Sequence, residues 1–243
     1  MSEVRVLAIV PAFNEEDALP LTLAELRRVA PWVDVLVVND HSSDRTADVA
    51  AGLGVPVVTL PFNLGVGGAL QAGFGYALAH GYYLAVQFDA DGQHDPAYLE
   101  TVVAPARRGD ADVVIGSRYV EASAYKAPRL RRAGMMLFAG IASRAMGRRV
   151  TDTTSGLRAY TRPVMHFCQE ELPHDFPDAP LLILLHRAGF RIREVPVEMR
   201  ERIAGESFYT ATRALYYPFK VGLASLVVAL RSRSSLPRVR EDA

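Results

Sequence analysis

Short apolar runs alternate with stretches of helical periodicity over the first 115 residues, and this alternation limits the chain to few architectures. Each run has the length and β-branched content of a buried strand. The runs are residues 4–10, 34–38, 55–60, 84–88 and 112–115. Strands that alternate with helices form a mostly parallel sheet with helices on both faces. We therefore predict an α/β fold built on a sheet of this kind.

Polar loops follow three of the predicted strands, at the point where each strand ends. Their sequences are PAFNEE after the first run, NDHSSD after the second and DADGQH after the fourth. Ligands of open parallel sheets bind beyond the carboxyl ends of the strands. The three loops are therefore predicted to meet at one edge of the sheet and to form a single binding site.

The segment DADGQHDP places several side chains that can bind metal directly after the fourth run. Asp89 and Asp91 can face one divalent cation only if the backbone leaves strand geometry between them, and Gly92 makes such a turn sterically easy. Their carboxylate oxygens suit Mg²⁺ or Mn²⁺, which usually bridge to the phosphates of a substrate. The alternative is an acidic turn that caps the helix beginning near Pro96. His94 is a candidate metal ligand or base, but its place beside the helix start favours a capping role.

Seven segments occur in the same order as in a known family: PAFNEE, VVNDHSSDRT, NLGVGGAL, FDADGQHDP, VIGSRY, TDTTSGLRAY and MRERIAGES. Through them, over about residues 4–207, the chain resembles the family 2 glycosyltransferases of the GT-A fold, and among these the polyprenyl-phosphate sugar transferases such as dolichol-phosphate mannose synthase. One departure is NDHSSD, where Asn39 and His41 replace the first acid and the glycine of the family pattern while Asp40 remains. The resemblance implies an inverting transfer of a sugar from a nucleotide-sugar donor to a polyprenyl phosphate or another lipid-linked acceptor.

The resemblance also implies a role for each loop on the donor side. Asp91 ligates the metal with Gln93, and Asp89 joins them or contacts the ribose or sugar of the donor. The residues implied to bind the donor, a UDP-, GDP- or dTDP-sugar, are Pro11, Ala12, Asn14, Glu15, Asp40, Gly67, Arg131, Arg202 and Ser207. Three alternatives remain open: Glu15 as a solvated charge at a helix N-terminus, the glycines around Gly67 as a close-packing turn instead of a phosphate cradle, and the pairs Arg131–Arg132 and Arg200–Arg202 as solvated helix faces.

On the acceptor side, the resemblance places Arg118 near the acceptor or the diphosphate. A transfer to a hydroxyl needs a general base near the acceptor oxygen, and Asp178 and Asp152 are the candidates. If the acceptor is a phosphate monoester, its oxygen is already an anion and no base is required. Two other functions stay open: transfer to a hydroxyl of a soluble glycan or metabolite, and a non-catalytic module that binds nucleotide sugars.

Composition and the C-terminal stretch bear on partners and location. Lys plus Arg and Asp plus Glu both number 27, which gives no sign of nucleic-acid binding. Cys168 is the sole cysteine, so no internal disulfide forms, and a reducing, cytoplasmic location is expected. No apolar run reaches the roughly 20 residues of a spanning helix.

We predict a glycosyltransferase domain over residues 1–207, an amphipathic helical segment over residues 208–231 and a disordered tail over residues 232–243. The helical segment either contacts the inner membrane face peripherally or packs on the core or on a second copy of the chain.

Overall fold

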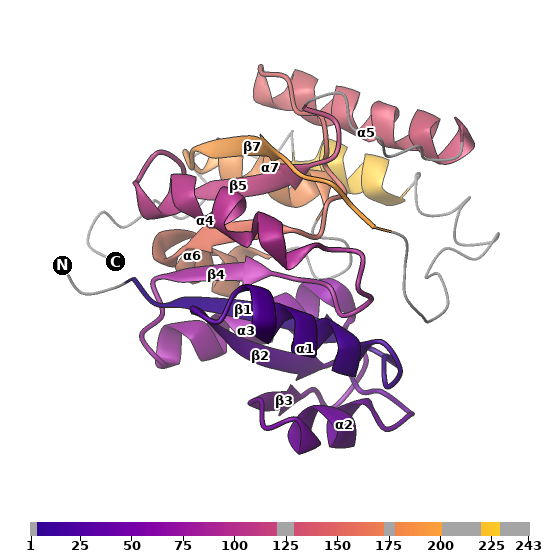
Figure 1. Cartoon of the computed structure of the whole chain (residues 1–243). Helices are drawn as coiled ribbons and strands as arrows, with labels where there is room; N and C mark the ends of the chain where they lie inside the picture. The colour runs from indigo at the N-terminus through magenta and orange to yellow at the C-terminus, as the bar shows by residue number, and fades with distance from the viewer. Residues whose placement is uncertain (1–3, 121–128, 173–177, 201–219, 229–243) are drawn as a thin grey trace.

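The computed structural model describes residues 4–120, 129–172, 178–200 and 220–228 of the chain. Within these ranges, one seven-stranded sheet has the order β3-β2-β1-β4-β6-β5-β7. The strands are β1 (Val6–Ala12), β2 (Val33–Asn39), β3 (Val57–Thr59), β4 (Leu84–Gln87), β5 (Val113–Ser117), β6 (Arg158–Thr161) and β7 (Ile192–Pro196). The helices are α1 (Leu19–Val29), α2 (Thr46–Gly52), α3 (Gly65–Ala79), the 3₁₀ turn η1 (Pro96–Tyr98), α4 (Leu99–Arg107), α5 (Arg129–Met146), α6 (Arg162–Glu171) and α7 (Ala179–Arg187). Figure 1 shows the sheet between these helices.

The sheet is parallel except at one strand. β1 pairs in parallel with β2 on one side and with β4 on the other, and β5 pairs in parallel with β7. β6 runs antiparallel between β4 and β5, with Tyr160 opposite Ala85 and Val113. The prediction of an α/β fold with a mostly parallel sheet is confirmed. β6 and β7 were not predicted from the sequence: β6 begins with a buried arginine, and neither strand is a continuous apolar run.

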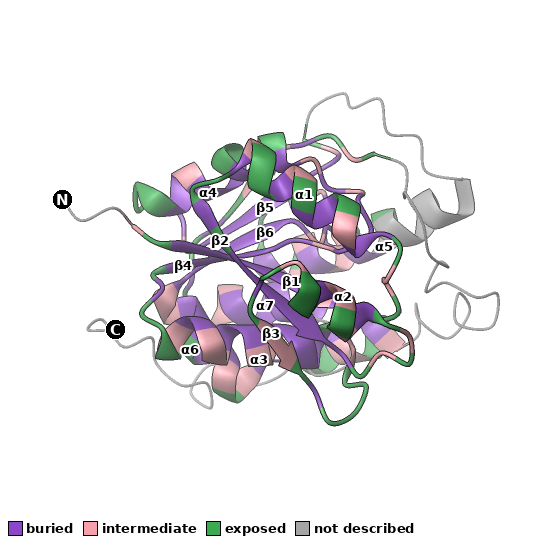
Figure 2. Cartoon of the chain, turned by 60° about the horizontal axis from the view of Figure 1, so that its bottom comes forward, coloured by how far each residue is buried: buried purple, intermediate pink, exposed green. Residues whose placement is uncertain are grey.

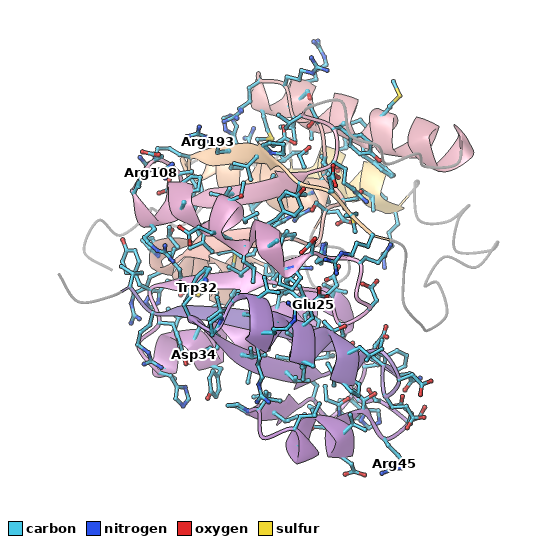
Figure 3. The ribbon with its side chains drawn as sticks, in the orientation of Figure 1. Glu25, Trp32, Asp34, Arg45, Arg108 and Arg193 are labelled. Carbon is cyan, nitrogen blue, oxygen red and sulfur yellow. The ribbon has the colours of Figure 1, made fainter. Side chains whose placement is uncertain are left out.

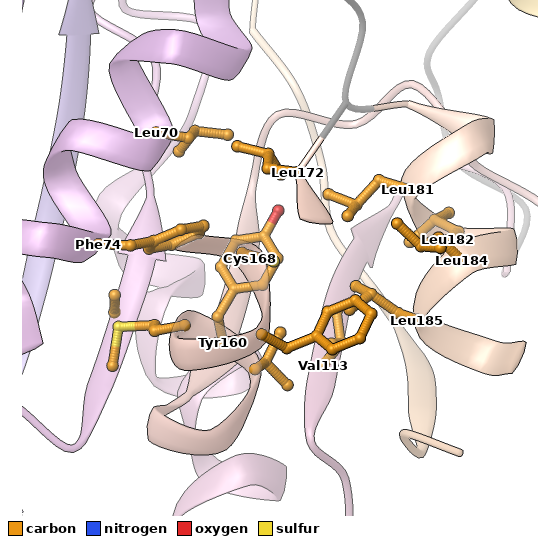
Figure 4. Close-up of a cluster of buried hydrophobic side chains, with 14 of the residues drawn as sticks. Leu70, Phe74, Val113, Tyr160, Cys168, Leu172, Leu181, Leu182, Leu184 and Leu185 are labelled. Atoms are coloured by element: carbon orange, nitrogen blue, oxygen red, sulfur yellow. The ribbon is translucent and has the colours of Figure 1, made fainter. Parts of the chain in front are cut away.

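Two apolar layers cover the sheet, one on each face. In β1, Leu7 and Ile9 face the layer of α3, α5, α6 and α7, whereas Val6, Ala8 and Val10 face the layer of α1, α2 and α4. The strands β1, β2, β4, β5 and β6 are accordingly buried along most of their length, as their purple colour in Figure 2 shows, whereas β3 at the edge of the sheet has no buried residue. Figure 4 shows the first layer around Tyr160, where Cys168 is also buried. Because Cys168 belongs to this apolar layer, burial raises the pKa of its thiol.

A short helix over residues 220–228 is the described part of the C-terminal segment. Its Val221 belongs to the same apolar layer as α3, and Ser225 is buried. Leu223, Leu226 and Val227 point away from the core and are 52%, 54% and 59% exposed. One side of the described helix therefore packs on the core and the other is exposed, while the predicted helical segment over residues 208–231 stays a prediction. The boundary predicted at residue 207 and the predicted tail lie outside the described residues. Among the described helices, none has the length and apolar content needed to cross a membrane.

Candidate active site

The loops after β1 and β2 are tied to each other at the carboxyl edge of the sheet. Asn14 accepts hydrogen bonds through Oδ1 from the backbone N–H and the hydroxyl of Ser43, and its own N–H donates to the hydroxyl of Ser42. The N–H of Glu15 donates to the hydroxyl of Thr46, at 2.8 Å. Asn14 has a φ of 55°, a left-handed conformation that asparagine tolerates better than most residues. The PAFNEE and NDHSSD loops are therefore joined by hydrogen bonds into one unit at the edge of the sheet where the sequence predicts that they meet.

Asp40 lies where this unit meets the N-terminus of α3. Its backbone N–H donates to the carbonyl of Ala12, and its carboxylate accepts the N–H groups of Leu64 and Gly65 at 2.7 and 2.8 Å. Burial raises the pKa of Asp40, and the two N–H groups partly offset that effect. The carboxylate thus takes the place at the helix N-terminus where a phosphate cradle would hold an anion.

Two glycines of α3, Gly68 and Gly73, are required by close packing. A Cβ on Gly68 would lie 2.3 Å from Cβ of Leu64, and one on Gly73 would lie 2.4 Å from Cγ2 of Ile9 on β1. Gly67 is buried in the first turn of the helix. These distances favour the close-packing interpretation of the glycine-rich turn, and the contact of Gly67 with a donor stays a prediction.

The Asp89 carboxylate is held at the start of the turn after β4. Its Oδ2 lies 2.9 Å from Nε2 of His94, and its Oδ1 accepts a hydrogen bond of 3.2 Å from Gln87. Burial opposes its charge, but the His94 imidazole, with help from Gln87 and Arg158, holds the pKa of Asp89 below its ordinary value. The side chain keeps 34% of its surface exposed. Asp89 is therefore an ionised carboxylate fixed at the rim of the site.

Asp91 follows in a tight turn. Gly92 has a φ of 75°, so the predicted departure from strand geometry occurs at this glycine. Oδ1 of Asp91 accepts the N–H of Gln93 at 3.0 Å, and the hydroxyl of Thr22 on α1 donates to the carbonyl of Ala90. Among the described residues, no group of three or more His, Cys, Asp or Glu side chains is arranged to hold a metal ion. A cation at this turn would depend on two carboxylates, the Gln93 carbonyl and oxygens of a bound substrate.

The interpretation of His94 as a capping residue was wrong. Asp95 makes that contact, because its Oδ1 accepts the N–H of Ala97 at the start of η1. His94 is 2% exposed, and its ring packs against Phe88 while Nε2 faces Asp89. No sequence signal separates these two roles, because both need a histidine beside an acidic turn.

The segment after β7 is anchored to the acidic turn. The N–H of Arg200 donates to the carbonyl of Gln93 at 2.9 Å, and the guanidinium pairs with Glu25 on α1 and with Asp95, at 2.8 and 2.7 Å. Glu25 is labelled in Figure 3. Arg202 and Ser207 lie outside the described residues. Arg131 lies on α5, but its side chain is not among those described. Their predicted contacts with a donor stay predictions.

Arg118 and Asp152 form a buried ion pair beside β5. Nε and Nη2 of Arg118 donate to the two carboxylate oxygens at 2.6 and 2.7 Å, and Nη2 also donates to Thr154. Burial opposes the charge of Asp152, but Arg118 holds the pKa of this carboxyl below its ordinary value. The geometry gives Arg118 a structural partner, and its predicted contact with the acceptor or the diphosphate stays a prediction. A paired carboxylate of this kind is a poor general base.

Asp178 lies at the start of α7, and its Oδ1 is 3.8 Å from Nη2 of Arg158. Arg158 is 1% exposed and donates to the carbonyl of Thr153. Burial disfavours its charge, but Tyr160 and Asp178 raise the pKa of the guanidinium. The same cation also stabilises the charge of Asp89, so Arg158 electrostatically links the two sides of the site. Arg158 lies in the segment TDTTSGLRAY, one of the seven that carry the resemblance, and no role was predicted for this residue from the sequence.

A family model described as "Glycosyl transferase family 2" matches residues 7–167. An undecaprenyl-phosphate mannosyltransferase of Micrococcus luteus is 37% identical, over 96% of this chain and 100% of its own. A polyprenol monophosphomannose synthase of Mycolicibacterium smegmatis is 34% identical, over 89% of this chain and 85% of its own. A dolichyl-phosphate hexose transferase of Haloferax volcanii is 36% identical, over 82% and 84% of the two chains.

A solved structure shares the fold. It is glucosyl-3-phosphoglycerate synthase from Mycobacterium tuberculosis in complex with Mn²⁺, uridine-diphosphate-glucose and phosphoglyceric acid, with a TM-score of 0.71. The match covers 94% of this chain and 80% of that chain at 20% sequence identity, so the likeness concerns the fold alone.

Proposed function

Since the chain belongs to glycosyl transferase family 2 and has the GT-A fold, we propose that it transfers one sugar, with inversion, from a nucleotide-sugar donor to a polyprenyl phosphate or another lipid-linked acceptor. Relatives that match most of the chain carry undecaprenyl phosphate, polyprenol and dolichyl phosphate in their names. The observation that carries the proposal is the arrangement of the loops after β1, β2 and β4 at one edge of the sheet, where hydrogen bonds fix them in place.

The donor nucleoside is assigned to the unit formed by the loops after β1 and β2. Its backbone and side-chain groups are held by hydrogen bonds between the loops, so they are ordered before a ligand binds. The residues assigned to the base and ribose are Pro11, Ala12, Asn14, Glu15 and Asp40. The residues assigned to the diphosphate are Gly67, Arg131, Arg202 and Ser207. Arginine suits the diphosphate because its planar guanidinium binds two phosphate oxygens at once.

The turn after β4 fits a hard divalent cation, Mg²⁺ or Mn²⁺. Asp89 is ionised and one-third exposed, Gly92 folds the backbone back, and Asp91 and Gln93 provide further oxygens. When bound, the cation neutralises, as a Lewis acid, the negative charge that develops on the departing nucleoside diphosphate. Asp89, Asp91 and Gln93 would hold it, and Asp89 in addition faces the ribose or sugar of the donor.

A phosphate acceptor fits the acceptor side better than a hydroxyl does. Asp152 is paired with Arg118, and Asp178 lies 3.8 Å from Arg158. A cation that stabilises a carboxylate makes it a weaker proton acceptor. A phosphate oxygen attacks as an anion and needs no base. Asp178→Asn is therefore expected to keep transfer to undecaprenyl phosphate within about tenfold, whereas loss of a true general base costs about 10²–10⁴-fold.

The proposal is tested with the purified full chain, Mn²⁺, radiolabelled nucleotide sugars and undecaprenyl phosphate in detergent. We expect a labelled lipid product, and we expect Asp91→Ala to abolish both transfer and donor hydrolysis. Asp48→Asn is the control, because it also neutralises a carboxylate but lies exposed on α2. Binding without any turnover by the wild-type chain would favour the non-catalytic module. A water-soluble hydroxyl acceptor that reacts as fast as the lipid would favour the second function.

The donor is identified by thermal unfolding with UDP-, GDP- and dTDP-sugars in the presence of Mn²⁺. A ligand at a hundred times its dissociation constant stabilises the folded state by roughly 2.7 kcal/mol, which shifts the midpoint clearly. If every nucleotide sugar leaves the unfolding midpoint equal to that of the ligand-free chain, binding of a nucleotide sugar is contradicted.

A peripheral position on the cytoplasmic face of the membrane follows from a lipid-linked acceptor. The exposed face of the helix over residues 220–228, with Leu223, Leu226 and Val227, is the assigned contact. Sedimentation with vesicles that contain anionic lipid tests it, and Leu226→Glu is expected to weaken binding. If the variant instead changes the sedimentation coefficient of the chain alone, the helix forms a contact between two copies.

A further inference from the structure

The Asp89 carboxylate has close neighbours on two sides, although part of its surface is exposed. His94 lies 2.9 Å from Oδ2 and Gln87 donates to Oδ1. On another side, the backbone of Gly156 approaches so closely that a Cβ at this position would lie 2.1 Å from Oδ2 and 2.7 Å from Cγ. Contacts below 3.0 Å to a Cβ do not occur in folded proteins, so any side chain at position 156 would displace the carboxylate.

His94 is placed for this one contact. Its ring is 2% exposed, and its Nδ1 is buried without a hydrogen-bond partner among the described residues. A buried polar atom without a partner destabilises the folded state. An apolar side chain would fill the same space without that cost. Nε2 lies at hydrogen-bond distance from the Asp89 carboxylate, which accepts the hydrogen bond that this ring nitrogen can donate.

We propose that His94 and Gly156 are positioning residues for the transfer, which fix the carboxylate of Asp89 in one orientation toward the donor. This inference rests on the proposed function. His94 supplies a directional hydrogen bond, and Gly156 supplies the space into which the carboxylate turns. A reacting group that is misplaced by 1 Å can lower a rate about 10²-fold, so holding one rotamer has a direct kinetic value.

Gly156→Ala separates positioning from folding. The atoms that its methyl group meets belong to the end of a short side chain, which can rotate away from His94 without movement of the backbone. We therefore expect a chain that still folds, with an unfolding midpoint lowered because His94 loses its hydrogen-bond partner, and a kcat of the folded protein lowered by about 10²-fold. The matched control is Gly140→Ala on α5, where the new Cβ would meet no atom within 4 Å.

Two substitutions of His94 form the second test. His94→Gln keeps an N–H donor for Asp89, whereas His94→Leu fills the space without a donor. We expect the glutamine variant to retain most of the wild-type kcat and the leucine variant to lose about as much as Gly156→Ala. Circular dichroism and the affinity for UDP, GDP and dTDP with Mn²⁺, measured by calorimetry, are recorded for each variant. A purely structural role would lower the unfolding midpoint in both variants and leave kcat unchanged.

The outcomes distinguish this inference from the proposed function. A wild-type chain that neither binds a nucleotide nor transfers a sugar overturns the proposed function and, with it, the inference. An active wild-type chain with Gly156→Ala and His94→Leu both within twofold of its kcat overturns the positioning role alone. A low kcat in both variants, with near-normal nucleotide affinity and rescue by His94→Gln, supports it.

Discussion

Breaking the ion pair between Arg118 and Asp152 is expected to destabilise the fold strongly. Asp152→Asn keeps the shape of the side chain but removes the charge that accepts hydrogen bonds of 2.6 and 2.7 Å from the guanidinium. The two side chains are 2% and 0% exposed, so water cannot replace the lost partner. Removal of one member of a buried pair costs about 3–5 kcal/mol. That is a large part of the about 5–15 kcal/mol by which a typical domain is stable.

Urea unfolding followed by the fluorescence of Trp32, the single tryptophan of the chain, measures this cost. A double-mutant cycle with Arg118→Met and Asp152→Leu gives the coupling between the two side chains. The double variant is expected to lose less stability than the two single variants lose together, because it contains no buried charge without a partner. The slope of the free energy of unfolding against urea is expected to stay constant.

The pH dependence follows from the lowered pKa of Asp152. Because the folded state holds this pKa below the unfolded value of about 3.9, the stabilisation by the pair is present above that value. It is lost as the pH falls through the folded pKa. The difference in stability between the wild type and Asp152→Asn should therefore shrink below about pH 4. Single variants that each cost under about 1 kcal/mol, or a double variant that costs their full sum, would refute this reasoning. A stable Arg118→Met chain that transfers no sugar would instead support the substrate contact implied by the resemblance.

Two further predictions concern backbone and packing. His41 has a φ of 59°, where the family pattern has glycine, so His41→Gly should raise the free energy of unfolding by about 1 kcal/mol; an unchanged or lowered value in urea unfolding would contradict strain at this residue. Gly73→Ala should lower the free energy of unfolding by about 1–3 kcal/mol, because its Cβ would meet Ile9 at 2.4 Å; the control Gly52→Ala, which meets no atom within 4 Å, should not destabilise the chain.

The first half of the fold was predictable because its signals are local. Each predicted strand from residue 4 to residue 115 is present within a few residues, and the loops that follow β1, β2 and β4 leave the sheet at one edge. β6 carried no such signal. Its first residue, Arg158, is charged and 1% exposed, and only its partners in three dimensions explain that burial. A pattern of polar and apolar residues cannot predict a buried charge.

The candidate site was predictable as a set of acids, but the partners of those acids were not. The sequence named Asp40, Asp89 and Asp152, which the fold stabilises in three different ways: through the N–H groups at the start of α3, the imidazole of His94 and the guanidinium of Arg118. The partners lie 24, 5 and 34 residues away along the chain. The pairings of Asp40 and Asp152 therefore depend on how the fold brings distant segments together, whereas Asp89 and His94 meet within one turn.

The kind of partner determines what each acid contributes. Asp152 has both carboxylate oxygens bonded to one buried cation, so it holds structure and has little capacity to bind a substrate. Asp89 is held by a ring nitrogen and an amide and keeps 34% of its surface exposed, so it is both oriented and accessible. Asp40 is buried, and its carboxylate accepts hydrogen bonds from N–H groups at the start of α3. Burial raises its pKa and so opposes its ionisation. Of the three, Asp89 alone combines ionisation, orientation and access, and variants that move only its carboxylate should therefore affect transfer most at the least cost in stability.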